Sequence, residues 1–406
     1  MHEIKSSKNF TPKSKKTFSN NLAQKIFWLN CLVLVAITIN LRAPIVSLGP
    51  IIEEIKSIYG INSALGGLLT SLPLIAFGSV SFLVAYFSPI RALVLGLMLI
   101  VFGEILRGFG GVFELFLGMG LIGCGVAIAN VLLPSFVKEK FPQKVPKMMG
   151  IYSLFLNLSS ISGILLALPL LHFFGLRFSL LFWLPFSVLA FVLYLPHTRN
   201  GRIFRKPKIM PKSRNLWTHK SAIKITAFMG TQSFIAYAMF AWFALIVSEK
   251  GFGNVFGANM LLLSQVVAVP VGFFAPLFLG RLRTRYRPLY MSVLCGLYVV
   301  GFALLLGFDS MVSVVVASIC IGIPMGGVFA IALLFISTKS ANAQIAAKLS
   351  SMAQGCGYLL ASTSPFILGA LHDYFEGFRE GICLLLCMGF VVSILGFLAN
   401  KSATIE

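Results

Sequence analysis

Twelve apolar stretches of about 20 residues divide this chain and constrain its fold more than any other feature. A helix needs about 20 apolar residues to cross the hydrocarbon layer of a bilayer, which is about 30 Å thick. We therefore predict an all-α polytopic membrane protein with twelve transmembrane helices. The third is short and follows a tight turn at Ser88-Pro89-Ile90. The predicted helices are 26–48, 63–87, 91–107, 113–136, 148–170, 178–196, 224–248, 258–279, 289–307, 312–336, 347–371 and 380–399.

The overall composition agrees with a membrane protein. Of the 406 residues, 58% are hydrophobic and only 11% are charged, whereas soluble domains carry about 25% charged residues. The first apolar run is longer than the core of about 7–15 residues in a cleavable signal peptide. We interpret it as the first membrane helix, preceded by a basic tail.

The net charge of +21 results from Lys and Arg residues in short segments between the apolar runs. If both termini are cytoplasmic, 27 of the 33 Lys and Arg residues lie on the cytoplasmic side. This is the positive-inside pattern of a membrane protein. The charge therefore indicates orientation and gives no reason to expect a nucleic-acid partner.

A basic linker separates two groups of six helices. The predicted segments are a cytoplasmic tail at 1–25, a first half at 26–196, the linker at 197–223, a second half at 224–400 and a short tail at 401–406. A shift of about 200 residues superposes the hydropathy patterns of the halves, which predicts two halves related by an axis along the membrane normal. The linker is expected to lie in solvent, where anionic lipid headgroups add to its role in orientation.

Catalytic and metal-binding patterns are missing from the sequence. We find no nucleophile triad or phosphate loop, and neither the seven cysteines nor the five histidines have ligand spacing. The cysteines lie in apolar runs, where they are expected to act as small buried hydrophobes. We predict no cofactor, no metal and no enzymatic activity. A polytopic enzyme or sensor is the alternative that these absences disfavour.

One arginine stands inside the first apolar stretch. Between Ile26 and Pro50, Arg42 is the only charged side chain, and a charge at that depth costs at least about 2.5–3.5 kcal/mol. It follows Lys25 by 17 residues, which places it in the outer half of the bilayer, and Pro44 is expected to loosen the helix there. A guanidinium suits a small carboxylate-like anion. We interpret Arg42 as an anion-binding group; the alternative is a structural arginine paired with Glu104 or with backbone carbonyls.

The remaining polar groups within the helices are few. Together with Arg42 they predict a substrate cavity that is polar, mostly neutral and carries one positive charge: Asn40, Asn130, Tyr152, Asn157, Gln232, Tyr237, Gln265 and Gln354. Glu104 has Arg107 three residues later on the same helix face. We expect a local ion pair between them near the outer end of the helix. The alternative role for Glu104 is proton coupling.

Several motifs resemble a known family. They are Asn40-Leu41-Arg42-Ala43-Pro44, Leu48-Gly49-Pro50-Ile51-Ile52, Gly67-Leu68-Leu69-Thr70-Ser71-Leu72-Pro73, Ala127-Ile128-Ala129-Asn130-Val131-Leu132-Leu133-Pro134, Met149-Gly150-Ile151-Tyr152-Ser153, Gln232-Ser233 with Tyr237 and Ala241-Trp242, Ser351-Met352-Ala353-Gln354, Gly357-Tyr358-Leu359-Leu360-Ala361, and Leu371-His372-Asp373. The series resembles the cyanate porter and 2-nitroimidazole transporter branch of the major facilitator superfamily. The resemblance implies two six-helix halves around a central cavity, with helices three, six, nine and twelve outside it.

Three departures from the family pattern limit what can be carried over. The usual charged loop between helices two and three is reduced to Ser88-Pro89-Ile90-Arg91, and Pro324-Met325-Gly326 replaces the Gly-Gln-Gly of the branch. The Gly-Pro motif that drug–proton antiporters carry in helix five is absent. Cyanate itself is therefore not assumed as the substrate.

These patterns predict a secondary transporter for a small polar or anionic organic solute that works by alternating access. The alternative is an efflux transporter for nitroimidazole-like or other toxic compounds. We expect a multi-pass monomer in the bacterial cytoplasmic membrane, with the lipid bilayer and a small-molecule substrate as its partners.

Overall fold

A computed structural model describes residues 12–61, 63–84, 87–199 and 216–406. Within these ranges the protein is all-α, and each of the twelve predicted stretches contains helix, as expected. The first stretch is interrupted at residues 40–42, and the end of the second lies partly outside the described residues. The first half contains α1 (Pro12–Ile39), α2 (Ala43–Val46), the 3₁₀ turn η1 (Gly49–Ile51), α3 (Ile52–Tyr59), α4 (Ser63–Val84), α5 (Pro89–Phe109), α6 (Val112–Lys140), α7 (Val145–Leu181), α8 (Leu184–Tyr194) and α9 (Pro196–Arg199). The second half contains η2 (Leu216–Thr218), α10 (Lys220–Val247), η3 (Ser248–Phe252), α11 (Asn254–Arg281), α12 (Arg287–Gly307), α13 (Met311–Thr338), α14 (Ala343–Phe375) and α15 (Arg379–Asn400).

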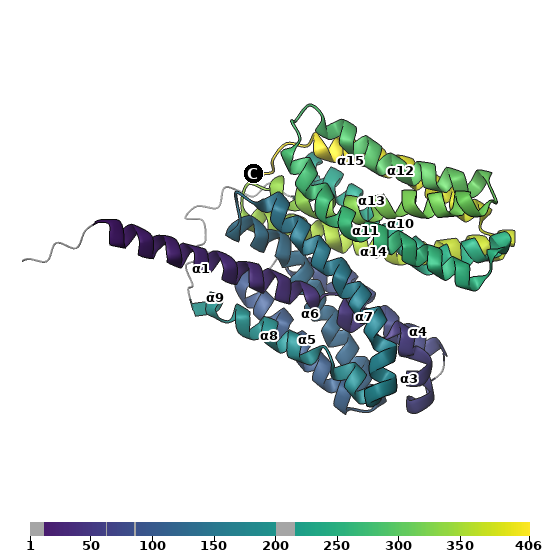
Figure 1. Ribbon diagram of the computed structural model, residues 1–406, viewed down its shortest axis with the longest axis horizontal. Coiled ribbons are helices and arrows are strands. Elements are labelled where there is room, and N and C mark those ends of the chain that lie inside the picture. Colours follow the sequence, from purple (N-terminus) through teal and green to yellow (C-terminus); the bar gives the residue numbers. More distant parts are fainter. Residues whose placement is uncertain (1–11, 62, 85–86, 200–215) are drawn as a thin grey trace, which may run out of the picture.

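The helices form two bundles, one from each half of the sequence (Figure 1). In the first bundle α6 packs against α4 and α5, and in the second α14 packs against α10 while α13 packs against α11 and α12. The bundles meet where α7 contacts α11 and where α14 contacts α4 and α6. Most of the predicted linker lies outside the described residues.

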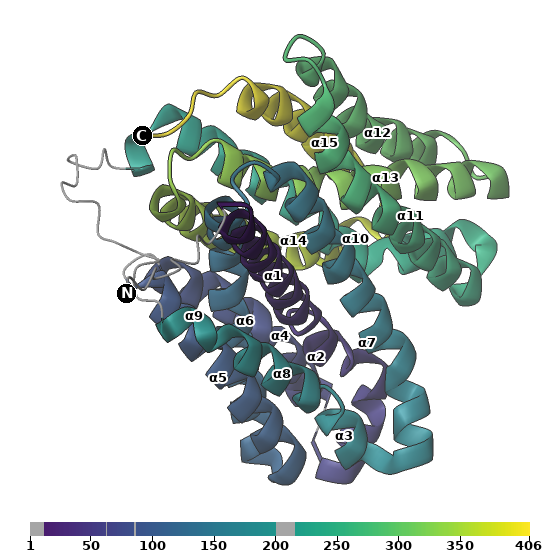
Figure 2. The ribbon, with the colours of Figure 1, turned by 60° about the vertical axis from the view of Figure 1, so that its left-hand side comes forward.

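The first membrane segment is broken in the middle. Its helix starts earlier than predicted, at Pro12, and ends at Ile39; Asn40-Leu41-Arg42 is a turn and α2 follows. Pro44 lies in the first turn of α2, where a helix does not need the missing N–H. The proline therefore begins a second segment, and the break lies before it. In Figure 2, α1 lies between α7 and α8, against which it packs.

A single glycine reverses the chain between the fifth and sixth predicted helices. Gly175 has φ +82° inside α7, a left-handed conformation that glycine adopts without a steric penalty. The residues before and after it belong to two different membrane crossings.

Close backbone contact joins α5 to α6. A Cβ added to Gly125 would lie 2.3 Å from the carbonyl oxygen of Gly96. Because apolar surface in lipid gives no hydrophobic drive between helices, such close packing is a main source of their attraction. This contact fixes α5, and with it Glu104 and Arg107.

Two of the hydrogen bonds between the halves lie on the side predicted to be cytoplasmic. Ser337 Oγ, near the end of α13, donates to the Pro134 carbonyl (2.8 Å). Ser351 Oγ, near the start of α14, donates to the Ser81 carbonyl. At the opposite end the helices of the two bundles diverge (Figure 1). The halves are thus fastened on one side.

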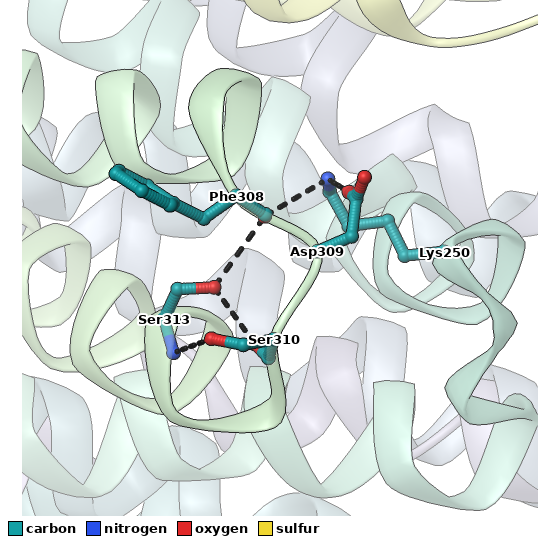
Figure 3. Close-up of polar contacts among 5 residues, drawn as sticks. All are labelled: Lys250, Phe308, Asp309, Ser310 and Ser313. Carbon is teal, nitrogen blue, oxygen red and sulfur yellow. Dashed lines mark hydrogen bonds and ion pairs between the residues drawn. The ribbon is translucent and has the colours of Figure 1, made fainter.

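A polar junction ties the second half together at its opposite, predicted outer end. Lys250 of η3 forms an ion pair with Asp309 and a 3.4 Å hydrogen bond with the Phe308 carbonyl (Figure 3). In the same loop, Ser310 caps α13 by accepting a hydrogen bond from the Ser313 N–H (3.1 Å). The junction connects the end of α10 to the start of α13 without involving the first half.

The C-terminal tail is strapped to the loop between α13 and α14. Ile405 donates to the Lys339 carbonyl (2.7 Å) and accepts from the Ala341 N–H (2.9 Å). Lys339 Nζ donates to the carbonyls of Asn400 (2.8 Å) and Ser402 (2.7 Å). Burial, and then the nearby Arg287 guanidinium, lower the pKa of Lys339. Because the ammonium is disfavoured there, its two carbonyl acceptors are needed to hold it.

Candidate substrate site at the helix break

The break in the first membrane segment frees backbone groups that neighbouring helices satisfy. Ser159 of α7 donates its hydroxyl to the Ile39 carbonyl and accepts from the Ala43 N–H (2.9 Å). Asn40 Nδ2 donates to the carbonyls of Ala36 (2.8 Å) and Phe186 (3.0 Å). Since buried backbone groups are costly when unpaired, these bonds define a stable turn and not a frayed end.

Arg107 supplies the strongest of these supports. Its side chain is fully buried, and Nη1 donates to the Pro44 carbonyl. Nε and Nη2 both donate to the Leu180 carbonyl (3.1 and 2.8 Å). Arg107 lies in the last turn of α5, at the predicted outer end of that helix, but its side chain points into the protein and is buried. It reaches from α5 to the start of α2 and the end of α7.

The expected ion pair between Glu104 and Arg107 is not among the contacts of the described residues. Glu104 Oε2 instead accepts a hydrogen bond from Ser187 Oγ of α8 (2.6 Å), and its other oxygen has no partner within the described chain. Nor does Glu104 pair with Arg42. The physical reason is that the donors of Arg107 are directed at backbone carbonyls on other helices.

Arg42 itself is half-buried at the end of the turn. Its guanidinium forms no hydrogen bond or ion pair with any residue that the structure describes. The phenols of Tyr237, Tyr358 and Tyr152 lie within electrostatic range of it. The cation thus lies near three phenol side chains, and no described residue serves as its counter-ion.

Contacts between the phenols and two amides connect the halves around this cation. Tyr152 donates to Asn130 Oδ1 (2.7 Å), and Gln354 Nε2 donates to the Asn130 carbonyl (2.9 Å). Tyr358 stacks on Phe77 with ring centroids 4.3 Å apart and meets Tyr237 edge-on at 6.1 Å. We name this set the Arg42 cluster: Arg42, Asn130, Tyr152, Tyr237, Gln354 and Tyr358.

The sequence profile of the Major Facilitator Superfamily matches residues 27–365. The chain belongs to this superfamily. Nine helices in the described ranges are long and apolar enough to cross a membrane, and the protein is a multi-pass membrane protein.

Named relatives of this superfamily member are bacterial transporters. The 2-nitroimidazole transporter of Escherichia coli is 30% identical over 96% of this chain and 100% of its own length. The uncharacterized transporter YycB of Bacillus subtilis is 33% identical over 91% of this chain and 92% of its own. The cyanate transport protein CynX of Escherichia coli is 26% identical over 84% and 89%. These relatives agree with the branch expected from the motifs.

Solved structures agree with the superfamily fold. The proton:xylose symporter XylE has a TM-score of 0.71 at 12% identity, covering 91% of this chain and 95% of its own. At this identity the likeness concerns the fold alone.

The remaining predicted site residues are not joined to the Arg42 cluster by a hydrogen bond. Asn40 supports the helix break, and Asn157 Nδ2 bonds to the Ser153 carbonyl of its own helix (3.0 Å). Gln232 Nε2 donates to the Met325 carbonyl (3.3 Å), which links α10 to α13. Gln265 is half-buried on α11, and its buried Nε2 has no partner within the described residues.

Tyr358 belongs to the cluster but was not predicted as a site residue. An aromatic side chain in an apolar helix usually belongs to the core, and composition alone does not distinguish it. One signal was present: Tyr358 follows Gln354 by four residues, so both lie on one face of α14.

Two buried atoms of the cluster have free hydrogen-bonding capacity. Asn130 Nδ2 and Gln354 Oε1 have no partner in the described part of the chain. Native proteins pair most buried polar atoms. A ligand beside Arg42 would therefore find a cation, a free amide donor and a free amide acceptor.

Proposed function

We propose that this protein is a secondary transporter that carries a small organic anion across the bacterial cytoplasmic membrane as a monomer. Arg42 is the group that binds the anion. The observation that carries the proposal is a half-buried guanidinium without a partner among the described residues, held at the helix break of the first membrane segment.

A comparison of the two arginines of the first half supports this role. Arg107 directs its donors at Pro44 and Leu180, as a structural arginine does. Arg42 donates to no described residue, although a charge within the bilayer costs several kcal/mol when it has no counter-ion. A carboxylate or similar anion would accept its planar fork of donors. Binding of the anion would offset the free-energy cost of this unpaired charge, which favours the substrate-bound state.

The arrangement of the halves supports alternating access. The inter-half bonds at Ser337 and Ser351 lie on the side predicted to be cytoplasmic. Arg42 is predicted to lie in the outer half of the bilayer, beyond these bonds. This corresponds to an outward-facing state, in which substrate would enter from outside. Breaking these two bonds and the Gln354–Asn130 bond between the halves, and closing the outer ends, would expose the cluster to the cytoplasm.

The test is uptake of small organic anions into proteoliposomes by Arg42→Gln and Arg42→Lys. We expect Arg42→Gln to lose about 2–5 kcal/mol of substrate binding, roughly 30-fold or more in affinity. Arg42→Lys should retain part of the binding because it keeps the charge but not the fork. The control is Arg177→Gln, an exposed arginine on α7. Full transport by a folded Arg42→Gln protein would refute the binding role.

Glu104 is our candidate for proton coupling. It is fully buried, receives one hydrogen bond from Ser187, and its free oxygen has no partner in the described chain. Buried carboxyl groups within membrane helices are typical members of proton pathways. We expect Glu104→Gln to retain substrate exchange but to lose uptake driven by a proton gradient. If the variant retains both, Glu104 is a structural residue.

Efflux of a planar nitroaromatic compound is the second candidate. The rings of Phe77, Tyr358 and Tyr237 pack against one another in an aromatic group, into which a planar ring would insert by separating them, and a relative is named a 2-nitroimidazole transporter. This reading predicts that deletion of the gene raises sensitivity to such compounds. It also predicts that Tyr358→Ala impairs transport more than Arg42→Gln does. Unchanged sensitivity across a compound panel would count against it.

A further inference from the structure

An apolar groove runs along the outside of the second half, between α11 and α12. Its volume is about 300 Å³, at the lower end of the range of small-molecule sites. It has no part in the Arg42 cluster. The lining residues are Pro270, Val271, Phe274, Ala275, Leu277, Phe278, Arg281 and Tyr290.

The length and exposure of the groove fit a lipid chain. Pro270 and Arg281 lie eleven residues apart on α11, which is about 16 Å along a helix. One leaflet of the hydrocarbon layer measures about 15 Å. Phe274 and Phe278 are 59% and 52% exposed, so the groove is open towards the surrounding bilayer. An acyl chain of the inner leaflet matches it in both length and chemistry.

The polar end of the groove is strongly basic. Arg281 is exposed at the end of α11, and Arg283 and Arg285 are exposed in the following loop. None of the three has a partner among the described residues. Arg287 differs, because its guanidinium donates to the carbonyls of Leu282 (3.0 Å) and Gly280 (3.4 Å) and so shapes the loop. The segment 280–290 contains no acidic residue.

We propose that this groove binds an anionic phospholipid, with one acyl chain along α11 and its phosphate on Arg281. The planar guanidinium suits a phosphate group, and basic sites at the cytoplasmic ends of membrane helices attract anionic headgroups. Ordinary boundary lipids contact every outer face. This site differs because a concave apolar wall and an unpaired arginine occur together.

Because of the position of the groove, a lipid bound there would support the contact between α11 and the first half. The other side of α11 faces the first half, where a Cβ on Gly150 would lie 2.6 Å from the Phe273 carbonyl and one on Gly280 would lie 2.7 Å from Pro146. These contacts belong to the fastened, predicted cytoplasmic side. The lipid therefore supports α11 on the side opposite to these contacts and stabilises the closed cytoplasmic side.

The headgroup is tested with the purified full-length protein in neutral detergent. Phosphatidylglycerol and phosphatidylcholine are titrated separately, bound lipid is counted by native mass spectrometry, and melting temperature is measured. We expect at least tenfold tighter binding of phosphatidylglycerol. Arg281→Gln should abolish this preference, whereas Arg285→Gln, which removes the same charge from the loop but does not line the groove, should retain it. Equal losses in the two variants would overturn the proposal.

Two further experiments test whether a free phosphate can replace the lipid and whether the groove itself holds the acyl chain. Inorganic phosphate alone should not raise the melting temperature; an equal rise would assign the site to a free anion and overturn the lipid. Val271→Trp should fill the groove and displace the lipid, while Val266→Trp, on an exposed face of the same helix, should not. Unchanged lipid retention by a folded Val271→Trp protein would likewise overturn it.

Discussion

At the scale of single residues, two arginines of the first half have opposite tasks. Arg42 could be singled out from the sequence because it is alone in an apolar run. The role of Arg107 could not, because its partners are the carbonyls of Pro44 and Leu180, and any residue type has a carbonyl. The same limit explains why the Glu104–Arg107 pair was predicted. Spacing shows which side chains share a helix face, but not which remote acceptors compete.

Arg107→Met should destabilise the protein and weaken substrate binding. The substitution removes the Arg107 donors from the Leu180 carbonyl and from the Pro44 carbonyl, which keeps only a 3.3 Å bond from Ser47 Oγ. A buried carbonyl left unpaired costs about 1–3 kcal/mol, and the turn that holds Arg42 is loosened. The stability and substrate affinity of Arg107→Lys should lie between those of the wild type and Arg107→Met, because an ammonium lacks the planar fork of donors that reaches both carbonyls. Thermal unfolding in detergent and substrate affinity give the two readouts. Arg177→Met is the matched exposed control, and equal melting temperatures for the two Met variants would contradict the assigned role.

At the scale of helices, the sequence predicts where the membrane helices lie, but it does not predict where the first of them is interrupted. Apolar length alone places the twelve membrane crossings, because a bilayer demands that length. The break at Asn40-Leu41-Arg42 was expected at Pro44, since proline is the usual cause of a kink. The actual cause is tertiary: Ser159 and Arg107 offer the freed backbone groups new partners, and the Phe186 carbonyl accepts a hydrogen bond from the Asn40 side chain. These partners lie on α5, α7 and α8, so the sequence around the break does not reveal them.

Alanine substitutions at two glycines of α6 distinguish the effect of close helix packing from the effect of helix propensity. A Cβ at Gly125 would meet the Gly96 carbonyl at 2.3 Å, whereas nothing lies within 4 Å of one at Gly120. We expect Gly125→Ala to lower the free energy of unfolding by about 1–3 kcal/mol through overpacking. Gly120→Ala should be neutral or stabilising by up to about 1 kcal/mol. Melting curves of the two variants check this, and the opposite order would mean that α5 and α6 do not pack as described.

At the scale of the whole molecule, closure on one side depends on contacts between distant segments. The hydropathy repeat predicts two halves, but not which ends touch. Ser337, Ser351 and the C-terminal tail are ordinary in sequence. The two serines acquire a role only because α13 and α14 pass near the first half, whereas the tail acts within the second half. The tail at 401–406 was predicted merely as cytoplasmic, whereas it fixes the loop between those two helices.

Truncating the last apolar side chain tests this strap. Ile405 is 1% exposed, so Ile405→Ala should lower the free energy of unfolding by roughly 2 kcal/mol or more. Glu406→Ala, at an exposed position one residue later, should have almost no effect. Thermal unfolding of both variants decides the matter. Equal melting temperatures would show that the tail is not part of the folded structure.

The helix break also sets an order for the insertion of the chain during synthesis. The Ile39 carbonyl gains its partner Ser159 only 120 residues later in the chain, and the Pro44 carbonyl, which has a local 3.3 Å bond from Ser47 Oγ, gains Arg107 63 residues later. Until then the first segment carries a charge and open backbone groups that lipid does not satisfy. We therefore expect it to stay beside the translocation channel until α5 and α7 emerge, so that the first half enters the bilayer as a unit.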